Sequence, residues 1–127
     1  MAIALFWTAM AFAFVCAVAP VPGRLLMADQ DKVEHFITFF TLTVLAVAAY
    51  PRRALAVTGM KLLAFGAFIE IVQALPMIGR EGDLADLLAD AAAIGSAGLL
   101  MAFTGTRLRL LRLLRPTPDF VQSVHGR

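Results

Sequence analysis

Residues 31–50 read DKVEHFITFFTLTVLAVAAY, and this stretch decides the class of fold. Three charged residues and a histidine occupy its first five positions, and no charged residue follows through Tyr50. A helix rises about 1.5 Å per residue, so roughly 20 apolar residues cross a bilayer core about 30 Å thick. The stretch therefore predicts a membrane-spanning helix over 33–50 with a polar end at the membrane surface.

Three further apolar stretches of similar length are separated by charged residues or by Pro and Gly, at 2–19, 56–75 and 86–104. Across the 127 residues, 61% are hydrophobic and the mean hydropathy is +0.83, far above a soluble domain. The sequence predicts an all-α membrane protein with four transmembrane helices. They form one domain over 1–104, and a basic tail follows at 105–127.

The first apolar stretch resembles a signal peptide only in part. No basic residue precedes it, and the small-residue site Ala17-Val18-Ala19 is followed by Pro20, which disfavours cleavage. We therefore expect this stretch to be retained as a helix. Cys16 is the single cysteine of the chain, which excludes an intrachain disulfide and a multi-cysteine metal site, and we expect it to be an inert packing residue.

The basic residues predict the orientation, because Lys and Arg in short loops mark the cytoplasmic side. An N-in, C-in arrangement places eight basic residues inside and three outside. Eight of the nine acidic residues then lie outside. The inner set is Arg52, Arg53, Lys61, Arg107, Arg109, Arg112, Arg115 and Arg127. Residues 107–115 read RLRLLRLLR, a spacing that predicts a short amphipathic basic helix on the inner membrane surface.

Helical spacing turns the outer polar residues into three directed stripes. Asp31, His35 and Thr38 share one face of the second helix, and Glu70 and Gln73 share one face of the third. The fourth helix contributes the stripe Asp83, Asp86 and Asp90. Helix capping is an equally good explanation for Asp31, and the positive end of the helix can explain Asp86. The deeper ionisable residues fit capping poorly and are expected to face protein or water: His35, Glu70 and Asp90.

These residues resemble the VanZ-like family, named for a protein associated with low-level teicoplanin resistance in bacteria. The resemblance covers about residues 28–100 and consists of Asp31-Lys32-x-x-His35-Phe36, Glu70-x-x-Gln73, Arg80, Asp86 and a polar position four residues on. The chain departs from the family pattern at Asp90, where Asn is typical, and at Ala93, where Gly is typical. The resemblance implies a multi-pass protein of the bacterial plasma membrane that acts in the cell envelope. It implies no reaction.

The first functional hypothesis is a binding module at the outer face. Lys32 and Arg80 would engage an anionic lipid headgroup, a cell-wall lipid intermediate or a glycopeptide, because their cationic groups suit phosphate and carboxylate. The remaining members of the expected binding site would hold these cations or recognise hydroxyl and amide groups: Asp31, His35, Glu70, Gln73, Asp83, Asp86 and Asp90. An ion pair between Arg80 and Asp83 or Asp86 is the simpler alternative for that arginine.

The second hypothesis is a membrane hydrolase acting on an envelope lipid through a metal or through acid–base chemistry, with His35, Glu70 and Asp86 as candidate catalytic residues. No recognised zinc-ligand spacing and no obvious nucleophile support it, so we expect neither a metal nor another cofactor. A small ion- or proton-coupled transporter and a purely structural subunit remain further alternatives. Membrane lipids are expected partners, nucleic acid is not, and the sequence leaves a homo-oligomer open.

Overall fold

The fold is all-helical over the part of the chain that the computed structural model describes, residues 1–19, 28–78 and 82–113. Side chains are not described at 28–30 and 106–113. Within these ranges the helices are α1 (Ala2–Val18), α2 (Ala28–Ala49), α3 (Leu55–Gln73) and α4 (Leu84–Leu113). Each coincides with one of the four predicted apolar stretches, which confirms the helical class.

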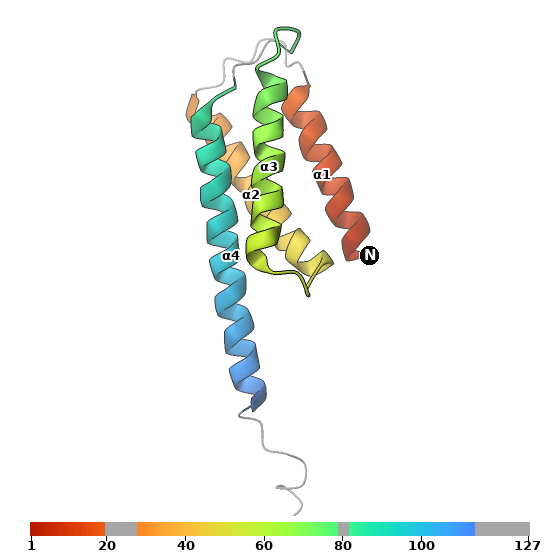
Figure 1. The fold of residues 1–127 in the computed structure, drawn as a ribbon, viewed down its shortest axis with the longest axis vertical. Coiled ribbons are helices and arrows are strands. Elements are labelled where there is room, and N and C mark those ends of the chain that lie inside the picture. The colour runs from red at the N-terminus through yellow and green to blue at the C-terminus, as the bar shows by residue number, and fades with distance from the viewer. Residues whose placement is uncertain (20–27, 79–81, 114–127) are drawn as a thin grey trace, which may run out of the picture.

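The helices run alternately up and down, so that sequence neighbours are antiparallel (Figure 1). The end of α1, the start of α2, the end of α3 and the start of α4 lie at one end of the bundle, here called the acidic end. The amino terminus and the α2–α3 connection lie at the opposite end, here called the basic end. This arrangement brings the start of α2, the end of α3 and the start of α4 together, as the sequence predicts.

α4 differs from the prediction in its length. It continues as one helix to Leu113, well past the other helices at the basic end (Figure 1), so the first part of the basic segment is an extension of α4 rather than a separate helix. Leu and Arg are strong helix formers, and the first proline after the apolar stretch is Pro116. Arg115 and the rest of the tail lie outside the described residues.

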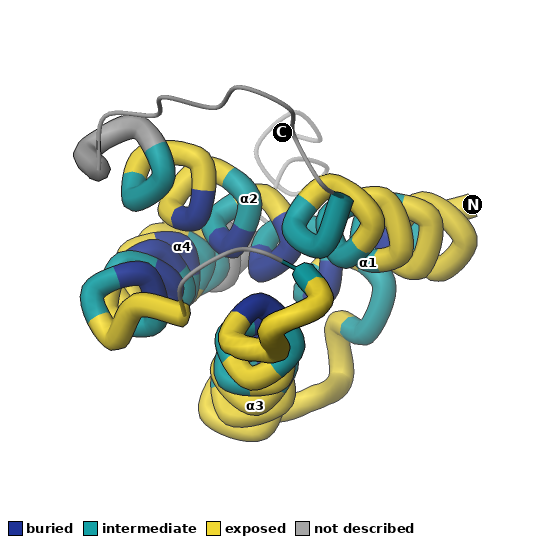
Figure 2. Tube along the Cα trace, turned by 90° about the horizontal axis from the view of Figure 1, so that it is seen from above, coloured by how far each residue is buried: buried dark blue, intermediate teal, exposed yellow. Residues whose placement is uncertain are grey.

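Three of the described helical segments are long and apolar enough to cross a membrane, namely Asp31–Ala49, Leu55–Gln73 and Leu84–Gly105. α1 is apolar but shorter, with 17 residues. Large apolar side chains point outward from the bundle, including Ile37, Phe68 and Leu99 (Figure 2 shows the exposed outer faces). An apolar exterior around a partly polar interior is the arrangement expected of a protein in lipid.

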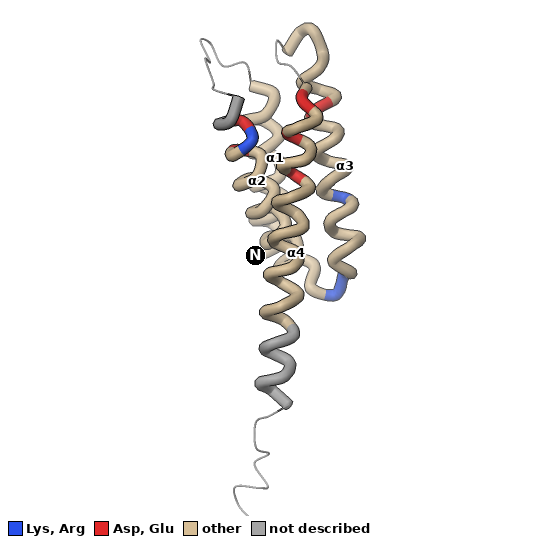
Figure 3. Tube along the Cα trace, turned by 90° about the vertical axis from the view of Figure 1, so that its left-hand side faces the viewer, with Lys and Arg blue, Asp and Glu red and all other residues tan. Residues whose placement is uncertain are grey.

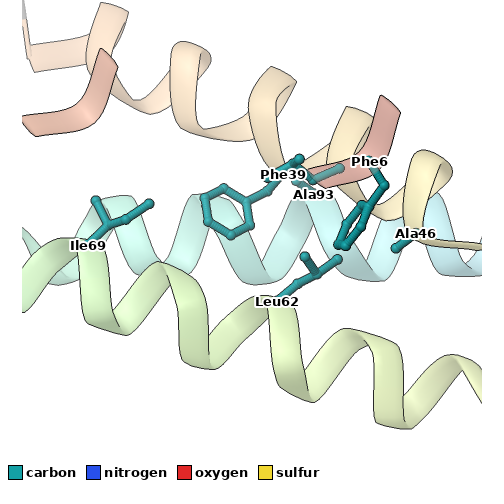
Figure 4. Packing of buried hydrophobic residues seen from close by; sticks show 7 residues of the cluster. Phe6, Phe39, Ala46, Leu62, Ile69 and Ala93 are labelled. Carbon is teal, nitrogen blue, oxygen red and sulfur yellow. The ribbon is translucent and has the colours of Figure 1, made fainter. Parts of the chain in front are cut away.

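The apolar core occupies the middle of the bundle and its basic end. Side chains from all four helices meet there, with Phe6, Phe39, Ala46, Leu62, Ile69 and Ala93 shown in Figure 4. The most extensive packing is between α2 and α4. Ala93 and Ala97 on α4 are fully buried, so small side chains let these two helix backbones approach closely. This close packing carries the polar residues of α4 against His35 one turn above.

Candidate functional site

The acidic side chains gather at one end of the bundle. Figure 3 shows acidic segments where α3 ends and α4 begins, and basic segments in the α2–α3 connection at the opposite end. Arg52 and Arg53 belong to that connection. Among the residues whose side chains are described, the acidic ones thus lie at the acidic end, whereas Arg52 and Arg53 lie at the basic end.

His35 and Asp90 form the centre of the site. His35 Nδ1 lies 3.0 Å from Asp90 Oδ1, which joins α2 to α4 by a buried hydrogen bond. When Asp90 is ionised its oxygen accepts a hydrogen bond from Nδ1–H, and a neutral imidazole then keeps its lone pair on Nε2. The imidazole stacks parallel to Phe39, with ring centroids 6.4 Å apart. The hydrogen bond to Asp90 at one edge of the ring and the stacking on Phe39 at one face therefore fix the orientation of the imidazole.

Glu70 brings α3 into the same site. Its Oε2 accepts a hydrogen bond of 2.8 Å from the backbone N–H of Asp83, and its Oε1 lies 4.0 Å from His35 Nε2. The first of these contacts requires Gly82 and Asp83 to lie directly against α3. Gly82 permits this, because a Cβ at that position would lie 2.8 Å from the carbonyl oxygen of Glu70.

Asp83 has a structural role that its place in the predicted stripe did not indicate. Its Oδ1 accepts a 2.9 Å hydrogen bond from the N–H of Ala85, so Asp83 is the N-cap of α4. Its Oδ2 lies 3.8 Å from Lys32 Nζ, in a partly exposed ion pair between α2 and α4. Asp83 thus caps α4 at the rim of the site, whereas Asp86 and Asp90 are buried below it.

Asp31 and Gln73 also depart from the simplest expectation. α2 begins at Ala28, so Asp31 is the fourth residue of the helix and not its N-cap. Gln73 is buried, and its Nε2 donates a 3.1 Å hydrogen bond to the carbonyl oxygen of Ala17 in the last turn of α1. Gln73 therefore fastens α3 to α1, although it shares a helix face with Glu70 in the sequence.

Several buried carboxylate oxygens have no hydrogen-bond partner among the described residues. They are Glu70 Oε1, Asp86 Oδ1 and Asp90 Oδ2. One nitrogen or oxygen atom from each of His35, Glu70 and Asp86 lies within 4.8 Å of the other two. Three ligand-type side chains from three helices thus converge, an arrangement that no local sequence spacing reveals.

Gly66 explains how α3 comes so close to this cluster. A Cβ at Gly66 would collide with Asp90 Oδ2 and would lie 3.2 Å from Phe39 Cζ. The absence of a side chain therefore makes room for the Asp90 carboxylate between α3 and α4. Gly66 thus permits the close approach of two side chains, Asp90 and Phe39, to α3.

A groove of about 270 Å³ runs beside the cluster, mainly between α1 and α2. Asp31, Glu34 and His35 line its polar part, and its other walls are mostly apolar side chains of α1, α2 and α3, among them Ala9, Phe12, Ala13, Leu42 and Ile69. Cys16 also lines the groove and is exposed, so it is not a buried packing residue, while its inertness stays a prediction. No pattern along the chain places Glu34 and Cys16 in a groove, because a groove depends on how two helices pack.

Arg80 lies outside the described residues, so its predicted role stays a prediction. No family model matches the chain, and no curated protein and no solved structure is similar enough to count as a match. The VanZ-like resemblance therefore rests on the motif residues alone, of which the structure brings His35, Glu70, Asp86 and Asp90 together.

Proposed function

We propose that the chain is a VanZ-like integral protein of the bacterial plasma membrane with four spanning helices, N-in and C-in. α1 would be the fourth span, its 17 residues being close to the lower length limit for crossing. Arg52 and Arg53 at the basic end support this orientation. At the same end, the Trp7 indole donates to the Tyr50 hydroxyl at 3.0 Å, and aromatic residues of this kind favour the membrane interface. The acidic end then faces outward.

The function that we propose is recognition of an envelope amphiphile, most specifically a cell-wall lipid intermediate in the outer leaflet. The observation that carries it is the groove between α1 and α2, which has carboxylates and an imidazole in one part and apolar walls elsewhere. An acyl or prenyl chain suits the apolar walls, because it exchanges one apolar environment for another. Asp31 and Glu34 suit a headgroup rich in hydroxyl and amide donors, since carboxylates accept hydrogen bonds.

Lys32 and Arg80 would contribute the contact with the phosphate of such a lipid. Lys32 is only partly buried, and its ion pair with Asp83 is partly exposed, so an anionic headgroup can compete for it at modest cost. The alternative ligand is a glycopeptide antibiotic, which the same headgroup-binding residues would recognise. The resemblance to a resistance-associated family supports an envelope role in either form.

Cys16 offers a direct test, because it is the only cysteine of the chain and lines the groove. In nanodiscs containing a polyprenyl-linked sugar–peptide lipid, we expect alkylation of Cys16 by an apolar maleimide to be slowed several-fold compared with nanodiscs that lack it. The matched control is Cys16→Ala combined with Leu99→Cys, which moves the thiol to an exposed position on α4 outside the groove. Equal protection of both thiols, or protection of neither, contradicts occupancy of the groove.

A resistance assay separates the two envelope ligands. In a strain lacking the chain, we expect complementation to restore teicoplanin tolerance, and Lys32→Ala to abolish that tolerance while the protein still accumulates in the membrane. Protection of Cys16 by teicoplanin alone, without the lipid, would favour the glycopeptide form. Tolerance that is unchanged in both Lys32→Ala and Arg80→Ala would contradict headgroup recognition by these residues.

A hydrolase acting on an envelope lipid is the second candidate, and one observation favours it. His35 is held at Nδ1 by Asp90, and its Nε2 faces Glu70 Oε1 at 4.0 Å, which is the orientation of a general base steered by a carboxylate. Release of a labelled headgroup that is lost in His35→Gln would support this candidate. A silent preparation that still protects Cys16 would support binding alone. A purely structural staple is less well supported, because it has no need of buried carboxylate oxygens without partners.

A further inference from the structure

The strongest unexplained feature of the molecule is the set of unpartnered oxygens around His35. Asp86 is 3% exposed, and its Oδ1 has no hydrogen-bond partner among the described residues. Glu70 Oε1 is likewise buried without a hydrogen-bond partner among the described residues, and it lies 4.0 Å from His35 Nε2. A buried anionic oxygen without a donor or cation costs free energy, so each of these oxygens calls for a ligand.

We propose that His35, Glu70 and Asp86 bind one divalent transition-metal ion, with Zn²⁺ or Mn²⁺ fitting the donor set best. One imidazole nitrogen and two carboxylate oxygens form a mixed set, which suits these ions better than the all-oxygen preference of Ca²⁺ or Mg²⁺. This departs from the expectation of no metal, which rested on the lack of a recognised spacing along the chain.

The geometry requires only a small contraction of the site. Ligand atoms on one tetrahedral ion lie roughly 3.4 Å apart, given bonds of about 2.0–2.2 Å. The three atoms here lie within 4.8 Å of one another, so rotations of side chains without helix movement can close the set. The Glu70 and Asp86 oxygens that would bind the ion are those without a hydrogen bond to lose.

Asp90 acts as a positioning residue for this site. Its Oδ1 accepts a 3.0 Å hydrogen bond from His35 Nδ1–H, which would leave Nε2 to face the ion. A carboxylate behind a metal-binding histidine fixes the tautomer and the ring orientation, and it raises the basicity of the ligating nitrogen. The Asp90 side chain is fully buried beside Gly66, so its own place is fixed by packing.

Three protein ligands leave at least one coordination position for water or for an oxygen of a bound molecule. His35 belongs both to this site and to the wall of the groove, so the open position lies beside the groove's polar part. An ion there would give the groove a positive partner for a phosphate. With Nε2 on an ion, His35 is a ligand and not the general base of the second candidate function, and ion binding itself requires neither turnover nor a lipid.

The test uses the full chain in detergent, stripped with a chelator and titrated with Zn²⁺, with Mn²⁺ or with Co²⁺ as a spectroscopic probe. We expect one ion per chain by equilibrium dialysis and mass-spectrometric metal analysis, tetrahedral d–d bands for Co²⁺, and a rise in Tm on loading. Glu70→Gln and Asp86→Asn should each weaken binding by at least about tenfold, as should Asp90→Asn through its effect on His35. Asp83→Asn is the matched control, because it neutralises a nearby carboxylate and keeps the cap.

Failure of the wild-type chain to bind any of these ions overturns the inference, as does stoichiometric binding that survives both Glu70→Gln and Asp86→Asn. A variant that no longer folds is recognised by its elution profile in gel filtration. In that case the wild-type stoichiometry and the Co²⁺ bands, which report nitrogen and oxygen ligands, decide the question. Because no lipid is present, the result is independent of the Cys16 protection assay.

Discussion

The His35 imidazole and the Asp90 carboxylate join α2 to α4 through a 3.0 Å hydrogen bond that is buried on both sides. It lies directly above the closest packing of these two helices, where Ala93 and Ala97 are fully buried. The bond therefore fixes the position of the polar cluster at the same time as the helix pair.

Replacing Asp90 separates its hydrogen bond from its charge. Asp90→Ala leaves His35 Nδ1 without an acceptor, and we expect it to lower the free energy of unfolding by about 1–2 kcal/mol. Asp90→Asn keeps an acceptor oxygen and should lower it by less than half as much. The measurement is unfolding in mixed micelles. Equal losses in the two variants would mean that the charge, and not the hydrogen bond, stabilises the helix pair.

Gly66→Ala should destabilise the bundle by roughly 1–3 kcal/mol, because the added Cβ collides with Asp90 Oδ2. Gly98→Ala on α4 is the control, since a Cβ there meets nothing within 4 Å. Combining Gly66→Ala with Asp90→Ala removes the collision, so the two losses should not add. Additive losses in this double-mutant cycle would show that Gly66 matters for a reason other than Asp90.

Gln73→Leu should loosen α1. Ala17 is in the last turn of α1, where carbonyl groups lack helical partners, and Gln73 Nε2 supplies a donor to its oxygen. Phe14 and Phe68 stack between α1 and α3 with centroids 5.8 Å apart, so cysteines at these two positions report the docking. In a Cys16→Ala background, we expect oxidative cross-linking of this pair to slow several-fold in Gln73→Leu. Ile71→Leu, which alters an outward-facing position, should leave the rate unchanged.

Asp83→Ala should cost about 1 kcal/mol of stability, because it removes the N-cap bond to Ala85. Asp83→Ser keeps a capping oxygen but loses the ion pair with Lys32. Since a partly exposed ion pair contributes little, Asp83→Ser should remain close to wild type. A loss in Asp83→Ser as large as that in Asp83→Ala would assign the effect to Lys32. Thermal denaturation in one detergent suffices for the comparison.

Reporter fusions test the proposed orientation. Alkaline phosphatase joined after Arg127 should be inactive and green fluorescent protein at the same place fluorescent, because the carboxyl terminus is expected inside. Alkaline phosphatase inserted after Met77 should be active. The reverse pattern would place the acidic cluster at the inner surface and would remove the outer-leaflet ligand from consideration.

The helices were predictable because charged residues, Pro and Gly separate apolar stretches that are each about as long as a membrane-spanning helix. The apolar stretch 33–50 lies within five residues of the observed limits of α2, and 56–75 lies within two residues of those of α3. The convergence of His35, Glu70 and Asp86 at one end was predictable from antiparallel connections alone. This part of the site needed no knowledge of side-chain contacts.

The finer geometry was not predictable, because it depends on the rotation of each helix about its axis. Gln73 shares a face with Glu70, yet it bonds to α1 while Glu70 faces α2 and α4. Asp83 is spaced as part of the stripe with Asp86 and Asp90, yet it caps α4. The groove exists only because α1 and α2 diverge around it, and neither sequence segment alone encodes that divergence.

The continuity of α4 links the two ends of the bundle mechanically. One unbroken helix of 30 residues carries Asp86 and Asp90 near its beginning and enters the basic segment near its end. Such a helix is about 45 Å long, so a tilt of about 5° moves one end by roughly 4 Å relative to the other. That displacement exceeds the adjustment needed to assemble or separate three ligand atoms. A tilt of α4 therefore changes the geometry of the cluster at the acidic end together with the position of the basic end.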